Sequence, residues 1–266
     1  MNGINHIAET FSHVRSQNRA ALIPYFTLGY PDPDACLSIL EAIANAGADL
    51  IELGVPFSDP LADGPTIQRS THRALEGGMT VQHCLDLTRQ LRARGATQPL
   101  LLMGYYNPIL AYGVSRFVNE AAAAGADGFI VPDLPPEEAQ EMQIACEQHQ
   151  LALVYLLAPT SPPERVAFVA GQTTGFLYLV SLTGVTGARD SLPADLDAFV
   201  SRVRDQAATP VAVGFGISTP AQARAVGGLA DGVIVGSALI NAVDRSSDPC
   251  LAAAEFVSRL REALAV

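Results

Sequence analysis

The residues best suited to chemistry lie in one run of sixteen, from Leu50 to Pro65. The run begins as an apolar strand with Glu52 near its middle and ends in a loop rich in proline, glycine and aspartate. A carboxyl group among apolar side chains is costly to bury unless it is paired, protonated or used in catalysis. Asp63 follows on the loop that leaves the C-terminal end of the strand. Either the two carboxyl groups share a pocket, or Glu52 reaches water or an arginine while Asp63 caps the next helix.

The absence of one residue type restricts the chemistry further. The chain contains no lysine, so all 16 of its basic residues are arginine. A Schiff base with a substrate, or with pyridoxal phosphate, needs a lysine amine. We therefore expect no such cofactor in this chain. No metal is expected either, because the histidines are scattered without the spacing of metal ligands: His6, His13, His72, His83 and His149.

Length and composition are typical of a single soluble domain spanning residues 1–266. The chain is 49% hydrophobic and 16% charged, and no linker or low-complexity tract divides it. No apolar run reaches the roughly 18 residues of a membrane span, and the first residues lack the apolar centre of a signal peptide. A net charge of −11 argues against binding nucleic acid. The cysteines are widely spaced, which indicates a reducing cytoplasm: Cys36, Cys84, Cys146 and Cys250.

Short apolar runs alternate with amphipathic stretches along the whole chain, which predicts βα units around a parallel sheet. The expected strands are Leu22–Thr27, Leu50–Gly54, Leu100–Met103, Gly128–Val131, Ala152–Leu157, Phe176–Val180, Val211–Gly214 and Val233–Val235. The helices expected between them include Pro33–Ala46, Val81–Arg94, Pro136–Gln148 and Pro220–Val226. Eight strands predict an α/β fold, a (β/α)8 TIM barrel in one domain, with an additional helix before the first strand.

A weak internal repeat supports this count. Three short segments each end a helix and open the next strand: Ala46–Asp49, Ala124–Asp127 and Gly228–Asp231. Glycine near a helix end permits the left-handed turn that such a junction needs. Aligning the segments places Ile130 and Ile234 at the position of Glu52. All three side chains are therefore expected to face the barrel axis, and aliphatic neighbours would raise the pKa of the Glu52 carboxyl group.

Active sites of such barrels lie at the C-terminal face, where three glycine-containing loops are suited to bind phosphate through backbone N–H groups. The candidate residues are Gly184, Gly187, Gly216, Gly236 and Ser237, with Arg189 as an outer contact. An apolar wall is expected opposite them: Tyr25, Leu102, Ile130, Phe215 and Ile234, with Tyr178 on the sixth strand. These residues either only fill the core or form a slot for a flat aromatic ring. A phosphate site and an aromatic slot together indicate an aromatic sugar phosphate.

The run from Glu52 to Pro65 also resembles the signature of the tryptophan synthase alpha subunit family. Four other stretches agree with that family and occur in its order: Pro24–Pro31, Leu101–Pro108, Ser181–Gly187 and Gly214–Ser218. The resemblance covers essentially the whole chain. It implies retro-aldol cleavage of indole-3-glycerol phosphate to indole and glyceraldehyde 3-phosphate. The indole ring accepts the electrons in this reaction, which agrees with the missing lysines.

The resemblance implies a role for several side chains. Glu52 would be the main acid and base, and Asp63 would hold the indole N–H group. Tyr178 would position Glu52 or the substrate, and Thr186 would close over Asp63. The chain departs from the family at Tyr25, where others have phenylalanine, and at Leu182-Thr183, where some have Arg-Ala. Neither departure affects the two carboxyl groups.

The resemblance further implies an αββα complex in which a beta subunit carries pyridoxal phosphate and receives the indole. Asp59 and Asn107 lie on loops that would face this partner. Two alternatives stay open: a stand-alone lyase that releases free indole, and a weakly catalytic chain whose main task is to activate the beta subunit. Intact Glu52 and Asp63 argue against a purely regulatory role. The dependence of the rate on the partner distinguishes the three hypotheses.

Overall fold

The centre of the molecule is a parallel sheet. The computed structural model describes residues 2–180, 195–214 and 216–265. Its strand segments are β1 (Ala21–Thr27), β2 (Ile51–Gly54), β3 (Leu100–Met103), β4 (Gly128–Ile130), β5 (Ala152–Val154), β6 (Leu156–Leu157), β7 (Leu177–Val180), β8 (Val211–Gly214) and β9 (Gly232–Val235). They pair in the order β5-β4-β3-β2-β1-β9-β8-β7-β6, and every pairing is parallel.

The two ends of this order belong to one continuous run of the chain. β5 pairs with β4 and β6 pairs with β7, and only Tyr155 separates β5 from β6. The backbone N–H of Tyr178 donates to the Tyr155 carbonyl oxygen at 3.1 Å, so Tyr155 still joins the two sides. The predicted strand Ala152–Leu157 is therefore divided, and the sheet is an eight-stranded barrel whose fifth strand changes partner. The predicted (β/α)8 TIM barrel is confirmed.

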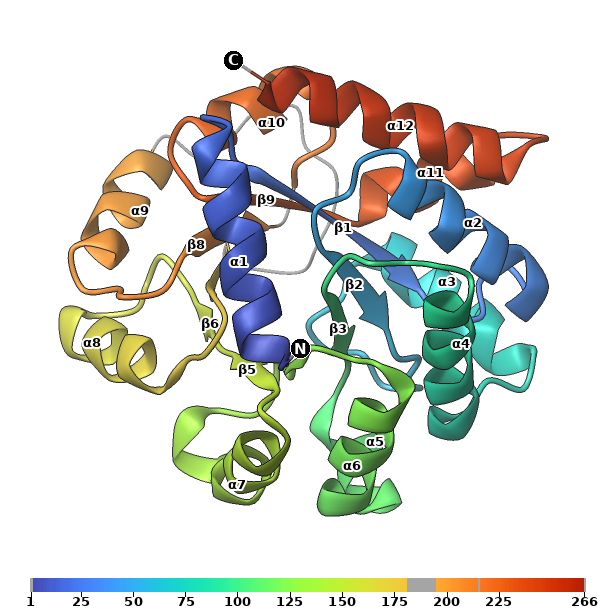
Figure 1. The fold of residues 1–266 in the computed structure, drawn as a ribbon, viewed down its shortest axis with the longest axis horizontal. Coiled ribbons are helices and arrows are strands. Elements are labelled where there is room, and N and C mark those ends of the chain that lie inside the picture. Colours follow the sequence, from blue (N-terminus) through green and yellow to red (C-terminus); the bar gives the residue numbers. More distant parts are fainter. Residues whose placement is uncertain (1, 181–194, 215, 266) are drawn as a thin grey trace.

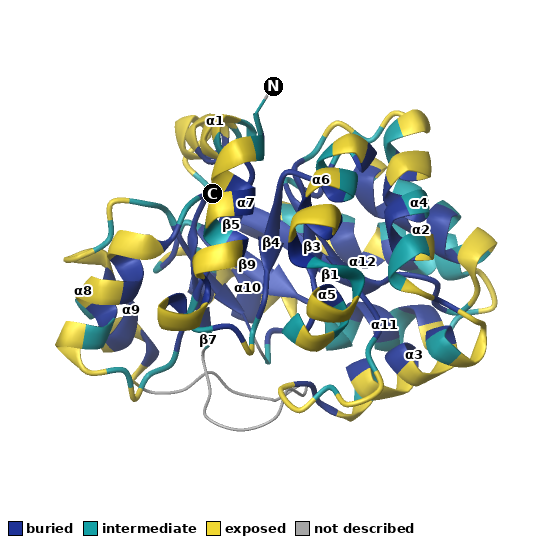
Figure 2. Ribbon diagram, turned by 90° about the horizontal axis from the view of Figure 1, so that it is seen from below, coloured by how far each residue is buried: buried dark blue, intermediate teal, exposed yellow. Residues whose placement is uncertain are grey.

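Helices surround the barrel (Figure 1), and their exposed faces point outward while the strands are buried (Figure 2). They are α1 (Gly3–Ser16), α2 (Pro33–Asn45), α3 (Pro65–Glu76), α4 (Val81–Ala93), α5 (Tyr106–Tyr112), α6 (Val114–Ala124), α7 (Gln140–His149), α8 (Pro163–Gln172), α9 (Leu196–Arg204), α10 (Pro220–Gly227), α11 (Ser237–Asp244) and α12 (Pro249–Leu264). The predicted helix Pro136–Gln148 is divided at Ala139 into a 3₁₀ turn and α7. Across the described residues, none of the helices combines the length and apolar character needed to cross a membrane.

The expected N-terminal helix is present as α1 and covers one end of the barrel (Figure 1). Its apolar side chains Ile7, Phe11 and Val14 are buried. The ring of Phe11 packs against Phe176, which directly precedes β7, with 5.7 Å between ring centroids. Because α1 lies against the N-terminal ends of the strands, the C-terminal ends are left for the connecting loops.

Strand register determines which side chains face the barrel axis. Glu52 of β2 lies opposite Tyr25 of β1, and Ile23, two residues before Tyr25, lies opposite Ile234. Side chains two residues apart on a strand share a face, so Glu52 and Ile234 both point inward. The same argument through β3 places Ile130 on the inner face, as expected from the repeat.

The three repeated segments end in aspartates with a common structural role. Each aspartate forms two hydrogen bonds with one residue at the start of a neighbouring strand. Its backbone N–H donates to the carbonyl oxygen of that residue, and its carboxylate accepts the backbone N–H of the same residue. The pairs are Asp49 with Leu22, Asp127 with Leu100 and Asp231 with Val211, with every bond 2.8–2.9 Å. At least one arginine also holds each carboxylate. These contacts fix the register of β1–β2, β3–β4 and β8–β9.

Replacement of Asp127 by alanine tests this role. The buried Leu100 N–H would lose its acceptor and Arg92 its carboxylate partner. We expect the free energy of unfolding to fall by about 2–4 kcal/mol in denaturant titrations. Asp86→Ala, which removes an exposed carboxylate paired with Arg89, serves as a control and should cost less than about 1 kcal/mol. Equal losses in the two variants would contradict the assigned role.

Candidate active site

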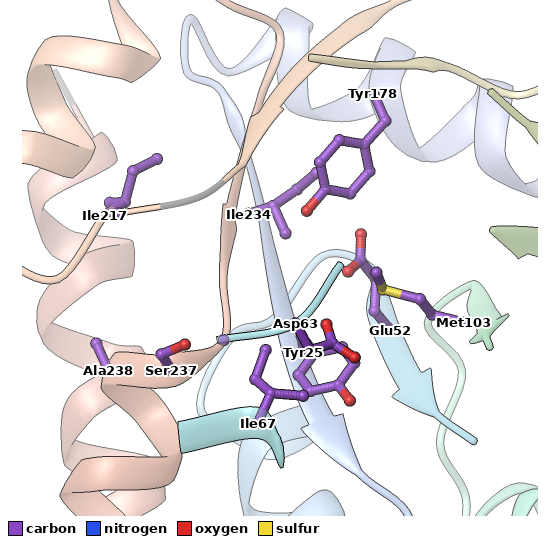
Figure 3. Close-up of a pocket in the computed structure, with 12 residues that line it drawn as sticks. Tyr25, Glu52, Asp63, Ile67, Met103, Tyr178, Ile217, Ile234, Ser237 and Ala238 are labelled. Atoms are coloured by element: carbon purple, nitrogen blue, oxygen red, sulfur yellow. The ribbon is translucent and has the colours of Figure 1, made fainter. Parts of the chain in front are cut away.

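A cavity opens where the strands end. Its lining residues are Tyr25, Glu52, Asp63, Ile67, Met103, Tyr178, Gly216, Ile217, Ile234, Gly236, Ser237 and Ala238. Figure 3 shows Glu52 of β2 and Tyr178 of β7 projecting towards the same space, with Asp63 and Tyr25 on its other side. The two carboxyl groups predicted to share a pocket therefore line one cavity.

The carboxyl group of Glu52 is fully buried and has no hydrogen-bond partner in the part of the chain that the structure describes. Burial penalises the charged form of a carboxyl group and raises its pKa. Here desolvation raises the pKa of Glu52 to about 8. The group is therefore predominantly protonated at neutral pH and can donate a proton into the cavity.

Asp63 sits in a different electrostatic environment. Burial raises the pKa of Asp63 to about 6, and a hydrogen bond from the Tyr105 hydroxyl opposes this shift. That hydroxyl accepts the Ala62 N–H at 3.0 Å and donates to Asp63 Oδ2, also at 3.0 Å. The Gln68 side-chain amide donates to the Asp63 carbonyl oxygen at 2.8 Å. Both the carboxylate and the backbone of Asp63 are thus held in place.

The two carboxyl groups consequently differ in charge over a useful pH range. Between about pH 6 and pH 8, Asp63 is ionised while Glu52 retains its proton. When two carboxyl groups have different pKa values, one can donate a proton while the other stabilises positive charge.

In the described residues, no cluster of three or more His, Cys, Asp or Glu side chains is arranged to hold a metal ion.

Two tyrosine rings fill the barrel beside Glu52, and each needs a glycine on the neighbouring strand. A Cβ atom at Gly54 would overlap the Tyr25 hydroxyl, and one at Gly214 would overlap the Tyr178 hydroxyl. Burial raises the pKa of both phenols above the ordinary value, and nearby carboxylates raise it further. Both tyrosines therefore remain neutral at physiological pH.

The hydroxyl of Tyr25 belongs to a directed chain of hydrogen bonds. Ser70 donates its only hydroxyl proton to the Ile67 carbonyl oxygen at 2.9 Å. The 2.7 Å contact between Thr27 and Ser70 must therefore be donated by Thr27. The 3.4 Å contact between Tyr25 and Thr27 is then donated by Tyr25. The phenolic proton of Tyr25 is thus directed to Thr27, so Tyr25 does not donate a hydrogen bond to the Glu52 carboxyl group.

The other end of the cavity offers backbone donors. Gly236 and Ser237 lie at the start of α11, where the first N–H groups have no partner within the helix and the dipole favours anions. Gly216 lines the same cavity and has a φ of +83°. Three of the predicted phosphate-binding residues therefore gather at one end. The predicted residues Gly184, Gly187, Thr186, Phe215 and Arg189 lie outside the described residues.

The apolar wall differs in part from the prediction. Tyr25 and Ile234 line the cavity, whereas Ile130 is fully buried and is not among the lining residues. Leu102 faces away from the axis, because it lies between the inward-facing Leu101 and Met103 on β3. Its assignment to the pocket is corrected accordingly, and Met103 lines the cavity in its place.

Sequence reasoning gave no role to Tyr105, although this residue lies inside one of the family-like stretches. Its position two residues beyond β3 is a signal that it reaches the C-terminal rim. Thr27 and Ser70 were also missed, because 43 residues separate them and their hydrogen bond exists only in the folded chain.

A groove on the rim brings together the two residues expected to face a partner. Asp59 lines it from the β2–α3 loop, and Asn107 lines it from the first turn of α5 rather than from a loop as expected. Phe57, Tyr105 and residues that follow β4 complete the lining. Leu61 also lines this groove and is 87% exposed.

The pH dependence of stability tests the state of Glu52. The unfolded carboxyl group releases its proton near pH 4.5 and the folded one near pH 8. Stability therefore falls as pH rises between these values, because the folded chain holds more protons. Glutamine does not ionise, so Glu52→Gln should become progressively more stable than wild type across this window, by on the order of a few kcal/mol in total.

Denaturant midpoints of both proteins at pH 5, 6.5 and 8 give this difference. Glu41→Gln, a change at an exposed carboxylate paired with Arg94, is the matched control and should show no such trend. A pH-independent difference between Glu52→Gln and wild type would contradict burial of an ionisable, unpartnered carboxyl group.

Comparison with known proteins agrees with this geometry. The family model described as tryptophan synthase alpha chain matches residues 11–264. The tryptophan synthase alpha chain of Roseiflexus castenholzii is 52% identical over 97% of this chain and 100% of its own length. That of Chloroflexus aggregans is 54% identical over 91% of each chain.

Solved structures agree as well. A Mycobacterium tuberculosis tryptophan synthase structure superposes with a TM-score of 0.92 at 41% identity, covering 98% of each chain. The tryptophan synthase subunit alpha of Legionella pneumophila gives 0.91 at 40% identity, covering 99% of this chain and 98% of its own. The chain belongs to the tryptophan synthase alpha chain family.

Proposed function

We propose that the chain is a carbon–carbon lyase that cleaves indole-3-glycerol phosphate to indole and glyceraldehyde 3-phosphate. The observation that carries this proposal is the protonated, unpartnered Glu52 beside the ionised Asp63, in a cavity whose far end presents the N-terminus of α11. The acid suits indole C3, the carboxylate suits the indole N–H group, and the anion-binding helix end suits the phosphate of this substrate.

Glu52 moves one proton from oxygen to carbon in the proposed reaction. Its carboxyl group first protonates indole C3, which makes the ring an electron acceptor. The carboxylate so formed then takes the proton from the hydroxyl group on the carbon attached to C3. As that bond to C3 breaks, the carbon becomes the aldehyde of glyceraldehyde 3-phosphate, and its electron pair restores the indole. Glu52 ends protonated again, so no external acid or base is consumed.

Asp63 acts on the ring nitrogen. Positive charge develops there when C3 is protonated, and a carboxylate that accepts the indole N–H stabilises it. By donating to its carboxylate, Tyr105 lowers the pKa of Asp63 and so favours the ionised form. The rings of Tyr25 and Tyr178, with Ile234, form the apolar wall against which a flat indole packs.

The phosphate binds at the start of α11. Gly236 and Ser237 offer N–H groups there, and Gly216 leaves room for close approach of an anion. A phosphate bound through backbone amides needs few basic side chains, which suits a chain with a net charge of −11. The family's glycine-containing loop at residues 184–187, with Thr186, completes this part of the proposal.

We further propose that the released indole passes to a beta subunit in an αββα complex. The groove that contains Asp59, Asn107 and the exposed Leu61 supports docking at this rim. Pyridoxal phosphate would be carried by that subunit and none by this chain, which has no lysine to anchor it. The four cysteines are free, which supports a cytoplasmic location.

Indole release from indole-3-glycerol phosphate, measured with and without a beta subunit, tests the proposal. We expect a slow rate alone, a large increase with the partner, and a loss of at least roughly 10²–10⁴-fold in Glu52→Gln. Glu41→Gln is the control and should match wild type. Fast turnover without the partner would indicate a stand-alone lyase. A fully active Glu52→Gln variant would rule out the mechanism, and activation of the partner without indole release would indicate a regulatory chain.

The acidic limb of the pH profile of kcat/KM tests the role of Tyr105. Its hydrogen bond lowers the pKa of Asp63, so Tyr105→Phe should move that limb from about pH 6 to higher pH. Activity should consequently fall most at pH 6 and least near pH 7.5. The neighbouring change Tyr106→Phe is the control and should leave the limb in place. A uniform loss of activity at every pH would count against a role through Asp63.

A further inference from the structure

Two helices carry the two ends of the proposed site. α3 begins two residues after Asp63, and α11 begins at Ser237 at the phosphate end. The two helices lie side by side against β1 (Figure 1 and Figure 2). Any displacement of one helix along the other therefore changes the distance between the carboxylate and the anion-binding N–H groups.

A set of polar contacts joins these helices, and we call it the α3–α11 clamp. Its members are Tyr30, Thr66, Arg69, Asn241 and Asp244. Asn241 Oδ1 accepts from the Thr66 hydroxyl at 3.4 Å and from Arg69 Nη2 at 3.3 Å. Arg69 also forms an ion pair with Asp244, which accepts the Tyr30 hydroxyl on its other oxygen. The first part of α3, from Thr66 to Arg69, is thereby tied to the second half of α11.

The different exposure of these groups argues that the clamp orients α3 and α11 and adds little to stability. The Arg69 side chain is 53% exposed, and exposed ion pairs contribute little to stability. Asp244 is more enclosed, and Tyr30 is buried at the foot of the clamp. Burial, then the bond to Asp244, raises the pKa of Tyr30 to about 12, so it stays a donor. The clamp therefore has a fixed direction of hydrogen bonding at physiological pH.

We propose that the α3–α11 clamp sets the spacing between the carboxylate end and the phosphate end of the site. It thereby selects substrates by the length of the linker between the aromatic ring and the phosphate group. This proposal rests on the proposed function. A ligand that occupies both ends gains from a fixed spacing, because binding at one end presents the other at high effective concentration. A ligand that occupies only one end gains nothing from it.

Calorimetric affinities for three probes test the proposal. The probes are indole, glycerol 3-phosphate, and an indole that carries a propyl phosphate on C3 and lacks the hydroxyl group needed for cleavage. We expect Arg69→Gln and Asp244→Asn to weaken binding of the joined probe by roughly three- to fivefold. Their affinities for the two single-ended probes should change less than about twofold. The double variant should lose little more than either single variant, because both remove the same contact.

Arg94→Gln is the matched control, since Arg94, the residue that follows α4, pairs with Glu41 of α2 away from the site and has a side chain that is 43% exposed. It should leave all three affinities unchanged. An equal loss for all three probes in the clamp variants, or no loss for the joined probe, would overturn the spacing role. If wild type binds the joined probe no more tightly than the fragments, the proposed function fails independently of the clamp.

Discussion

The enclosed carboxyl group of Glu52 is the constraint on which the arrangement of the site depends. A carboxyl group without a partner is costly to bury, and the barrel accepts this cost at one inward-facing position. Its neighbours do not relieve the cost, because Tyr25 directs its proton to Thr27. The burial that penalises the charge also raises the pKa of Glu52 to about 8, so the same feature that lowers stability supplies an acid at neutral pH.

The two ends of the barrel divide stability and chemistry between them. At the N-terminal end, aspartates such as Asp127 accept strand N–H groups and pair with arginines, so their polar groups are satisfied. Helix α1 covers this end with apolar side chains. At the C-terminal end, polar groups instead face a cavity. A firmly held register at one end allows partly unsatisfied groups to persist at the other, because the strands connect the two rigidly.

Helix α3 links these groups into one unit. Its start follows Asp63, its inner face contacts β1 through Ser70 and Thr27, and its outer face joins α11 through Arg69. Tyr25, which lines the cavity, donates its hydroxyl proton to Thr27 and so connects the cavity wall to this contact. The phenol therefore adds a contact between the cavity wall and the helix that follows Asp63.

Much of this protein could be read from its sequence because the signals are local. Alternation predicted the barrel strands within about a residue at most ends, the repeated aspartates marked strand starts, and one run joined Glu52 to Asp63. Tertiary structure decided what depends on neighbours distant in the chain. The division of the fifth strand at Tyr155 follows from its two partners, and Met103 rather than Leu102 lines the cavity because register sets the inward face. The separate pKa values of Glu52 and Asp63 likewise arise from burial and from Tyr105, which only folding brings together.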